Sequence, residues 1–326
     1  MENYTKNQHF LSQAEQRLNA INPAAKAKNQ RIYSFDILRG SDGAVCELAE
    51  ARSARIESNL SDIDLYSFSL LDDKVRLNFE SVFGKYESEV KVWVNNLIAK
   101  ASNGSDDVSE EVQKIFLLKF LNTLRNPFAM RDLINLFSNY INYFPTDKEL
   151  RSIYFKIDSK NMPHADAVCT RYKVTKEQYV SWLKILYLIL YVKDGDETNL
   201  LESIAKSFYE NPLHYIQVFL FVYSKGQPVL LSDKGFSEFD HSGASINYEF
   251  NLCDRAHIAY AFTDISKALP DHPLYGNEQV LNVFKNQPKN IDVRLILDNQ
   301  EMLVAYNKRI VNQSHKSVFC KYKIGL

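Results

Sequence analysis

The stretch Tyr215-Ile216-Gln217-Val218-Phe219-Leu220-Phe221-Val222-Tyr223 distinguishes this chain from an all-helical protein. It consists largely of aromatic and β-branched residues, which are enriched in strands. A turn at Lys225–Pro228 follows, and Val229-Leu230-Leu231 then predicts a second strand. The last third of the chain is therefore expected to form a β-sheet. Its further predicted elements are strands at Ser245–Phe250, His257–Phe262, Ile291–Leu297 and Ser317–Lys321, and a helix at Gln300–Asn312.

The region before this sheet is predicted to be helical. In Val75–Ala99 the apolar residues recur at the spacing of one helical face, which predicts a single helix. Capping boxes are expected at Thr146 with Glu149 and at Thr175 with Gln178, and a capping pair at Asp107 with Glu110. Further helices are predicted from Ser12 onward and at Cys46–Ser53, Ser109–Leu124, Arg131–Tyr143 and Asn199–Tyr209.

One strand is predicted outside the C-terminal third. Arg31–Ile37 alternates between polar and apolar residues, and we expect it to join the C-terminal sheet and bring the two chain ends together. The fold class is thus α+β, a predominantly helical body with a smaller mixed β-sheet formed mainly by the C-terminal third. We expect residues 1–326 to form one compact unit. A subdivision into a helical body (40–210) and an α+β part (211–326 with strand 31–37) stays open, because no Pro/Gly/Ser-rich linker separates them.

Composition limits the classes of function. The 326 residues are 45% hydrophobic and 24% charged, and a net charge of −1 argues against a broad basic surface for nucleic acid. The four cysteines are far apart in sequence, which predicts neither a disulfide framework nor a zinc site and suits the cytoplasm. Residues 1–8 lack the apolar core of a signal peptide. The most apolar stretch, Trp182–Val192, contains Lys184 and is too short for a span of about 20 residues, so no membrane contact is expected.

No familiar nucleotide or hydrolase motif is present. The sequence lacks G-x-x-x-x-G-K-[ST], G-x-G-x-x-G, H-E-x-x-H and G-x-S-x-G, and it holds only 10 glycines. A nucleotide cofactor held by a glycine-rich loop is therefore not expected.

The N-terminal segment contains the first candidate site residues. His9 lies between Gln8 and Phe10, and an imidazole can act as an acid, a base or a ligand near neutral pH. If a helix began this early, Gln13 and Arg17 would share one face with His9. A single histidine is also commonly a hydrogen-bonded structural residue, so both roles stay open.

Two carboxylates and two arginines are the next candidates. Glu80 and Glu87 lie on the expected Val75–Ala99 helix beside its apolar face, and they could perform acid–base work or bind a metal ion. Arg125 and Arg131 flank an Asn-Pro corner and could hold a phosphate or a carboxylate. The alternatives are a solvated helix edge for the glutamates and helix capping for the arginines.

The remaining candidates lie in the C-terminal third. Asp233 follows a short apolar strand, a position where both sites and turns are common. Asn307, Asn312 and Gln313 carry amides on an otherwise packed helix, where such groups need partners. These amides are expected either to contribute to a site shared with the N-terminal segment or to hold the strand ends of the sheet.

Short motifs along nearly the whole chain resemble one family. They are His9–Gln13, Ile32–Asp36, Phe79-Glu80 with Tyr86-Glu87, Leu124–Pro127 with Arg131, Val229–Asp233, Asn307–Gln313 and Ser317–Cys320. In this pattern the chain is similar to the domain-of-unknown-function 4238 family of bacterial and fungal proteins. Ser12 stands where the family usually carries Pro, and the family's Asn-Pro after Asp233 is missing. The resemblance implies an accessory or antiviral-defence role in bacteria and no established activity.

Three hypotheses on function follow. The leading one is an interaction or effector component of a bacterial stress or phage-defence system, with no classical cofactor. The second is a hydrolase of phosphodiester bonds, assisted by Mg²⁺ or Mn²⁺, in which Arg125 and Arg131 hold the phosphate. Its catalytic residues would be His9, Glu80, Glu87 and Asp233.

The third hypothesis is nucleic-acid binding without catalysis. It needs a basic surface, which would be built from Lys308, Arg309, Lys316, Lys321 and Lys323. The sequence leaves the oligomeric state, the metal and the identity of a protein or nucleic-acid partner open.

Overall fold

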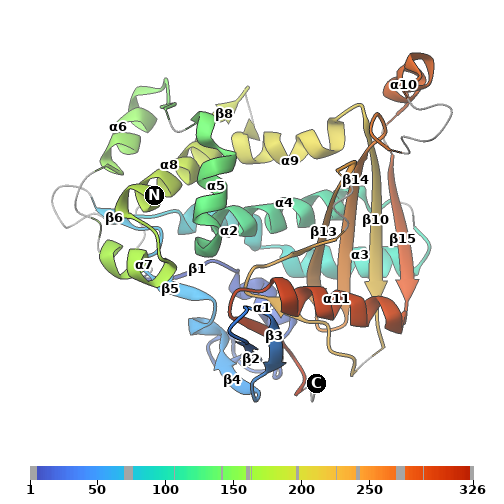
Figure 1. Ribbon diagram of the computed structural model, residues 1–326, viewed down its shortest axis with the longest axis horizontal. Helices are drawn as coiled ribbons and strands as arrows, with labels where there is room; N and C mark the ends of the chain where they lie inside the picture. The colour runs from blue at the N-terminus through green and yellow to red at the C-terminus, as the bar shows by residue number, and fades with distance from the viewer. Residues whose placement is uncertain are drawn as a thin grey trace.

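The computed structural model describes residues 6–69, 76–105, 107–140, 142–158, 162, 164–195, 198–224, 226–239, 243–268, 276–288 and 290–323. It confirms the α+β class. Most of the helices lie to one side of a five-stranded sheet, and the N-terminal strands lie beneath both (Figure 1).

The five-stranded sheet is mixed. Its edge strand β15 runs parallel to β10, and the other neighbouring strands are antiparallel. The long strands form where the sequence predicts them, because Val, Ile and aromatic side chains pack well on a pleated surface. In spatial order the strands are β12 (Ser237–Glu238), β13 (Ser245–Cys253), β14 (Ala256–Asp264), β10 (His214–Val222) and β15 (Ile291–Leu297).

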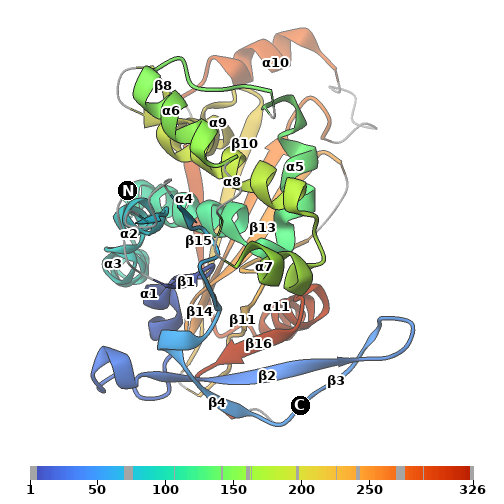
Figure 2. The ribbon, with the colours of Figure 1, turned by 90° about the vertical axis from the view of Figure 1, so that its left-hand side faces the viewer.

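Helices cover both faces of this sheet (Figure 2). Leu220 belongs to a core shared with α3 (Val90–Ser102), α4 (Ser109–Arg125) and α9 (Leu200–Glu210). Its neighbour Phe221 belongs to a second core, on the side of α11. The period-two alternation of a strand thus places consecutive side chains in two different cores. Helix α11 spans Gln300–Gln313.

The helical body is organised around α8 (Lys176–Tyr191). This helix is apolar around most of its circumference, as is typical of a buried helix, and Trp182 is fully buried. The capping box of Thr175 with Gln178 is confirmed. Around α8 lie α5 (Met130–Leu136), α6 (Lys148–Lys156) and α7 (Ala165–Tyr172). None of the helices in the described ranges has the length and apolar character needed to cross a membrane.

A smaller sheet joins the two chain ends. Strand β2 (Arg31–Arg39) pairs antiparallel with β16 (Ser317–Cys320), as the sequence predicts, with Phe35 opposite Val318. The other members are β11 (Leu231–Ser232), β3 (Val45–Leu48) and β4 (Arg52–Arg55). This sheet also has five strands, and it is separate from the sheet of β12, β13, β14, β10 and β15.

Short elements complete the fold. They are β1 (Asn7–His9) paired with β5 (Ser61–Ile63), β6 (Phe68–Ser69) with β7 (Arg76–Leu77), β8 (Lys193–Asp194) with β9 (Thr198–Asn199), helices α1 (Gln13–Leu18) and α10 (Glu278–Lys285), and 3₁₀ turns at Ala27–Asn29, Ile56–Ser58, Pro127–Ala129 and Ser138–Tyr140.

Several local predictions are wrong. Val75 lies outside the described residues, and the rest of the expected helix Val75–Ala99 contains two helices, α2 (Glu80–Glu87) and α3, because Phe83 packs in the helical-body core and Val90 in the sheet core. The expected helix Cys46–Ser53 falls on strands β3 and β4, which pair with β2. The caps expected at Asp107 and Thr146 are absent: α4 has no side-chain cap, and Asp147 caps α6.

Candidate functional site

Six of the predicted site residues come together where β1, α1, α2 and α4 converge. We call this group the α1–α2 polar site. Hydrogen bonds and electrostatic interactions connect its members, and four of them are half-buried rather than fully enclosed. The members are His9, Gln13, Arg17, Glu80, Glu87 and Arg125.

Local sequence determines the position of α1. Ser12 caps its N-terminus by accepting from the Glu15 backbone N–H at 3.1 Å, and α1 ends after six residues at Leu18. His9 lies in β1, before the cap, so the predicted common helical face does not exist. The turn between β1 and α1 nevertheless brings the His9 ring next to Gln13.

A chain of hydrogen bonds connects Arg17 to the protein backbone. Arg17 donates to the Gln13 side-chain oxygen at 2.5 Å, and the Gln13 amide lies 3.4 Å from His9 Nδ1. His9 Nε2 lies 3.3 Å from the carbonyl oxygen of Ile56, which can only accept. His9 Nε2 therefore carries the proton, Nδ1 accepts from Gln13, and the chain holds Arg17 in one orientation.

Burial determines the charge state of His9. It lowers the pKa of the imidazole to about 4, and the nearby positive charge of Arg125 adds to this effect, while the hydrogen bond to Ile56 opposes it. At neutral pH the ring is uncharged and both of its nitrogens are occupied. His9 is thus placed as a positioning residue for Gln13 and Arg17.

The two glutamates on α2 have different environments. Burial, with a contribution from Glu87, raises the pKa of Glu80 to about 7, although the charge of Arg125 opposes the rise. The Glu80 Oε1 atom is buried and has no hydrogen-bond partner among the described residues. Glu87 instead accepts from Arg125 Nη1 at 2.5 Å. Glu80 is therefore the titratable group of the site near neutral pH.

Arg125 is the most deeply buried cation of the site. Burial disfavours its charge, but the carboxylates of Glu87 and Glu80 outweigh this effect, so its pKa is raised. Its Nη2 donates to Asn122 at 2.7 Å, and its guanidinium lies 4.7 Å from the Phe83 ring centroid. Its Nε, like that of Arg17, is buried without a hydrogen-bond partner among the described residues.

A buried ionic network adjoins the site, and its residues are not among those predicted from the sequence. Glu15 forms an ion pair with Lys119 and accepts from Asn122, which in turn accepts from Arg125. Two signals in the sequence could have revealed it. Ser12 and Glu15 have the spacing of a capping box, and Lys119 interrupts the apolar run of α4, where a charged residue needs a partner.

Asp233 lies in a separate cluster. Its carboxylate accepts from the backbone N–H groups of His315, Lys316 and Ser317 at 2.8, 2.6 and 3.0 Å. Burial raises the pKa of this carboxyl, and the nearby His315 together with the three amide bonds opposes the rise. Asn126 donates to the Asp233 carbonyl at 2.8 Å. Asp233 thus joins the loop before β16 to the corner after α4.

The structure does not bring the other predicted residues to the site. Asn307 forms hydrogen bonds with the backbone of Pro228 and Leu230, and Gln313 with that of Glu238. Both amides therefore hold strand ends, which is the second of the two roles expected from the sequence. Arg131 is exposed and donates to the Lys173 carbonyl, and Asn312 is exposed. Gln8 is buried and bonds Ser67 and the backbone of Tyr66.

The basic C-terminal side chains do not form a continuous free patch. Arg309 makes two hydrogen bonds to the Glu249 carboxylate, at 2.6 and 2.7 Å. Lys321 pairs with Asp254 at 2.5 Å. Two of the five cations proposed for nucleic-acid binding are therefore neutralised by carboxylates.

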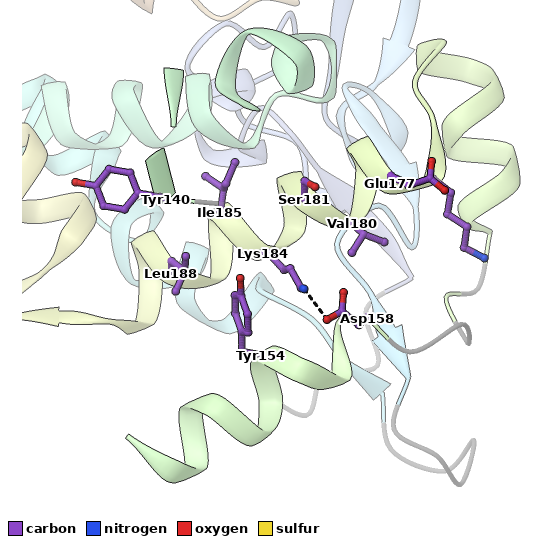
Figure 3. Close-up of a pocket in the computed structure, with 10 residues that line it drawn as sticks. Tyr140, Tyr154, Asp158, Glu177, Val180, Ser181, Lys184, Ile185 and Leu188 are labelled. Atoms are coloured by element: carbon purple, nitrogen blue, oxygen red, sulfur yellow. Dashed lines mark hydrogen bonds and ion pairs between the residues drawn. The ribbon is translucent and has the colours of Figure 1, made fainter. Parts of the chain in front are cut away.

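A hollow of about 320 Å³ lies between α6 and α8 (Figure 3), and the residues that line it include none of the α1–α2 polar site. Lys184 extends across it to Asp158 at 2.5 Å and lies 4.8 Å from the Tyr154 ring centroid. The charges of Lys184 and Asp158 thus neutralise each other within the hollow.

In the described parts of the chain, no three His, Cys, Asp or Glu side chains are grouped so as to hold a metal ion. The donor set for Mg²⁺ or Mn²⁺ that a metal-assisted hydrolase needs is thus not assembled from these residues alone. Comparisons with protein-family models, curated proteins and solved structures found no match for this chain.

Proposed function

We propose that the chain is a hydrolase that cleaves a phosphodiester at the α1–α2 polar site, with Glu80 as its acid–base group. The observation that supports this most strongly is the Glu80 carboxyl, which has a pKa of about 7 and a buried oxygen without a partner among the described residues. A general base works best when its pKa lies near the working pH. The Glu80 carboxyl, with its pKa of about 7, meets this condition at neutral pH.

The arginines supply the second requirement. Phosphodiester cleavage builds negative charge on the phosphate oxygens, and fixed positive groups stabilise it. Arg17 is half-buried, is held by the Gln13–His9 chain, and contacts an amide rather than a carboxylate. It is the residue that would donate to a phosphate oxygen. The buried Arg125 would stabilise the same negative charge on the phosphate from the protein interior.

In the proposed step, the Glu80 carboxylate accepts a proton from water as the water oxygen forms a bond to phosphorus. The bond from phosphorus to the leaving oxygen then breaks, and Glu80 returns the proton to that oxygen. The products are an alcohol and a phosphomonoester, so one carboxyl serves as base and then as acid. A stress or phage-defence setting rests on the family resemblance alone and stays a prediction.

The test is a cleavage assay on single- and double-stranded RNA and DNA, with Mg²⁺, Mn²⁺ or EDTA present. Glu80→Gln keeps the size of the side chain and removes its proton transfer, so we expect a rate about 10²- to 10⁴-fold lower. The matched control is Glu89→Gln, an exposed glutamate beyond the end of α2, which should cleave like the wild type. Absence of cleavage on all substrates, or full activity in a folded Glu80→Gln variant, would refute the proposal.

A further inference from the structure

We infer that two copies of this chain associate by antiparallel pairing of their β15 edge strands, in the register centred on Val293. This inference is independent of the proposed hydrolase activity. It rests on a strand edge with which no other described strand pairs, on the charges along that strand, and on the apolar side chains at its two ends.

The first observation is the edge itself. β15 (Ile291–Leu297) pairs with β10 on one side, and on its other side no strand of the described ranges pairs with it. An edge strand presents unpaired N–H and C=O groups that can pair with a further strand. Soluble proteins commonly protect such edges with proline, lysine or a bulge. β15 contains neither proline nor lysine, its pairing with β10 has no register shift, and its two charged residues, Asp292 and Arg294, have opposite signs.

The second observation is the charge pattern, which selects one register. Asp292 and Arg294 point to the same face of the sheet and form an ion pair at 2.8 Å. In a two-fold antiparallel pair centred on Val293, Asp292 of each copy lies opposite Arg294 of the other. A shift of the centre to Asp292 or to Arg294 would place two like charges directly opposite each other. Opposite charges across a strand pair are favourable and like charges unfavourable, so only the central register is matched.

The third observation concerns the ends of β15. α10 precedes the strand and projects away from the body (Figure 1), and its Val283 is 62% exposed. Leu297 and Val304 follow at the opposite end and are 62% and 66% exposed. Antiparallel pairing brings the beginning of β15 in one copy beside its end in the other. Val283 of one copy would thus lie at the same end of the interface as Leu297 and Val304 of the other copy.

The occupant that fits these observations is a second copy of the chain. A strand from an unrelated partner could use the same N–H and C=O groups, but it would not need the reciprocal Asp292–Arg294 match. Self-complementarity is the property of a two-fold interface, in which one patch meets itself. The expected product is a continuous sheet of ten strands, five from each copy.

The test uses charge reversal in the full-length chain, with mass measured by sedimentation velocity over a range of concentrations. The Asp292→Arg variant carries two positive side chains on β15, and the Arg294→Asp variant carries two negative ones. Each variant alone should dimerise at least about tenfold more weakly than the wild type, because both cross-strand pairs become repulsive. An equimolar mixture of the two variants should recover a dimer, and so should the double variant Asp292→Arg/Arg294→Asp.

The mixing experiment distinguishes a lost contact between copies from a simple loss of stability in each variant. Each single variant also breaks the ion pair within its own strand, and mixing cannot restore that contact. Recovery on mixing therefore reports contact between copies. A wild type that is monomeric at every concentration would overturn the inference. So would single variants that still dimerise like the wild type, or a mixture of folded variants that stays monomeric.

Discussion

Lys119 on α4 and Glu15 on α1 form an ion pair in which each side chain is only 2% exposed. The Lys119 ammonium also donates to the Asn251 carbonyl at 2.6 Å, so the pair connects α1 and α4 to strand β13. Glu15 additionally accepts from Asn122, one hydrogen bond away from Arg125. The position of the polar site therefore depends on a buried charge pair outside it.

Removing only one partner of this pair should be costly. Lys119→Met leaves the Glu15 carboxylate buried without its counter-charge, and we expect the free energy of unfolding to fall by about 3–5 kcal/mol. The double variant Glu15→Gln/Lys119→Met leaves no buried charge and should lose less than Lys119→Met alone. Urea-induced unfolding measures both.

Lys114→Met is the matched control on the same helix. Lys114 is 41% exposed and pairs with Glu110 at the surface, so its loss should cost less than about 1 kcal/mol. If the double variant proves less stable than Lys119→Met, the loss in Lys119→Met does not arise from an uncompensated Glu15 charge.

The proposed activity should depend on pH through Glu80. Only the carboxylate can accept the proton of water, so kcat/KM should rise with pH and level off above the Glu80 pKa of about 7. Glu87→Gln should move this inflection to lower pH, because the negative charge of Glu87 raises the Glu80 pKa. Initial rates from about pH 5 to about pH 9 would show both effects.

An inflection that stays in place in the Glu87→Gln variant would show that a different group titrates. Asp158→Asn is a suitable control, because Asp158 lies on the rim of the hollow between α6 and α8 and should leave the profile unchanged.

The sequence predicted the strands better than the helix boundaries. β10, β14 and β15 follow from runs of Val, Ile and aromatic residues, whose preference for a pleated surface is local. The division of Val75–Ala99 into α2 and α3 is not local. It arises because Phe83 and Val90 pack in different cores, and the positions of those cores depend on the sheet and on α8.

The site was predicted in part for a reason that does not hold. His9, Gln13 and Arg17 were expected to share a helical face, yet His9 lies in a strand and a turn creates the contact. The convergence of Glu80, Glu87 and Arg125 depends on how α2 packs on α4, which spacing along the chain does not encode. The polar interruption at Lys119 was visible in the sequence, but its partner Glu15 lies 104 positions away.

Asp233 should prove structural. Its two carboxylate oxygens accept three backbone N–H groups, and Asp233→Asn replaces one oxygen with an NH₂ group that cannot accept. At least one of these partly buried N–H groups would lose its partner, so we expect a loss of about 1 kcal/mol or more in the free energy of unfolding. The exposed Asp158→Asn serves as the control for the same chemical change, and urea unfolding compares the two. Equal stability of the two variants would contradict the assignment.

His257 offers the opposite case, a native residue whose replacement should stabilise the protein. Its ring is stacked between Phe221 and Tyr306, with centroids 4.4 and 4.0 Å away. Both ring nitrogens are buried and lack hydrogen-bond partners among the described residues. Each unpartnered buried polar group costs about 1–3 kcal/mol, whereas the slightly larger ring of Phe costs about 1 kcal/mol in crowding. His257→Phe should therefore raise the free energy of unfolding by about 1 kcal/mol or more at neutral pH.

The gain in the free energy of unfolding from His257→Phe should be larger at mildly acidic pH. Burial lowers the pKa of His257 well below 6.5, so below that pH the unfolded chain binds a proton that the folded chain does not. The wild type consequently loses stability as the pH falls through 6.5 towards the folded pKa, and this contribution is absent in the Phe variant. Urea unfolding of both proteins at neutral pH and at about pH 5 measures the difference. If the gain in the free energy of unfolding were equal at the two pH values, His257 would bind a proton in the folded protein as readily as in the unfolded chain. If the Phe variant were less stable at both pH values, the His257 nitrogens would have hydrogen-bond partners.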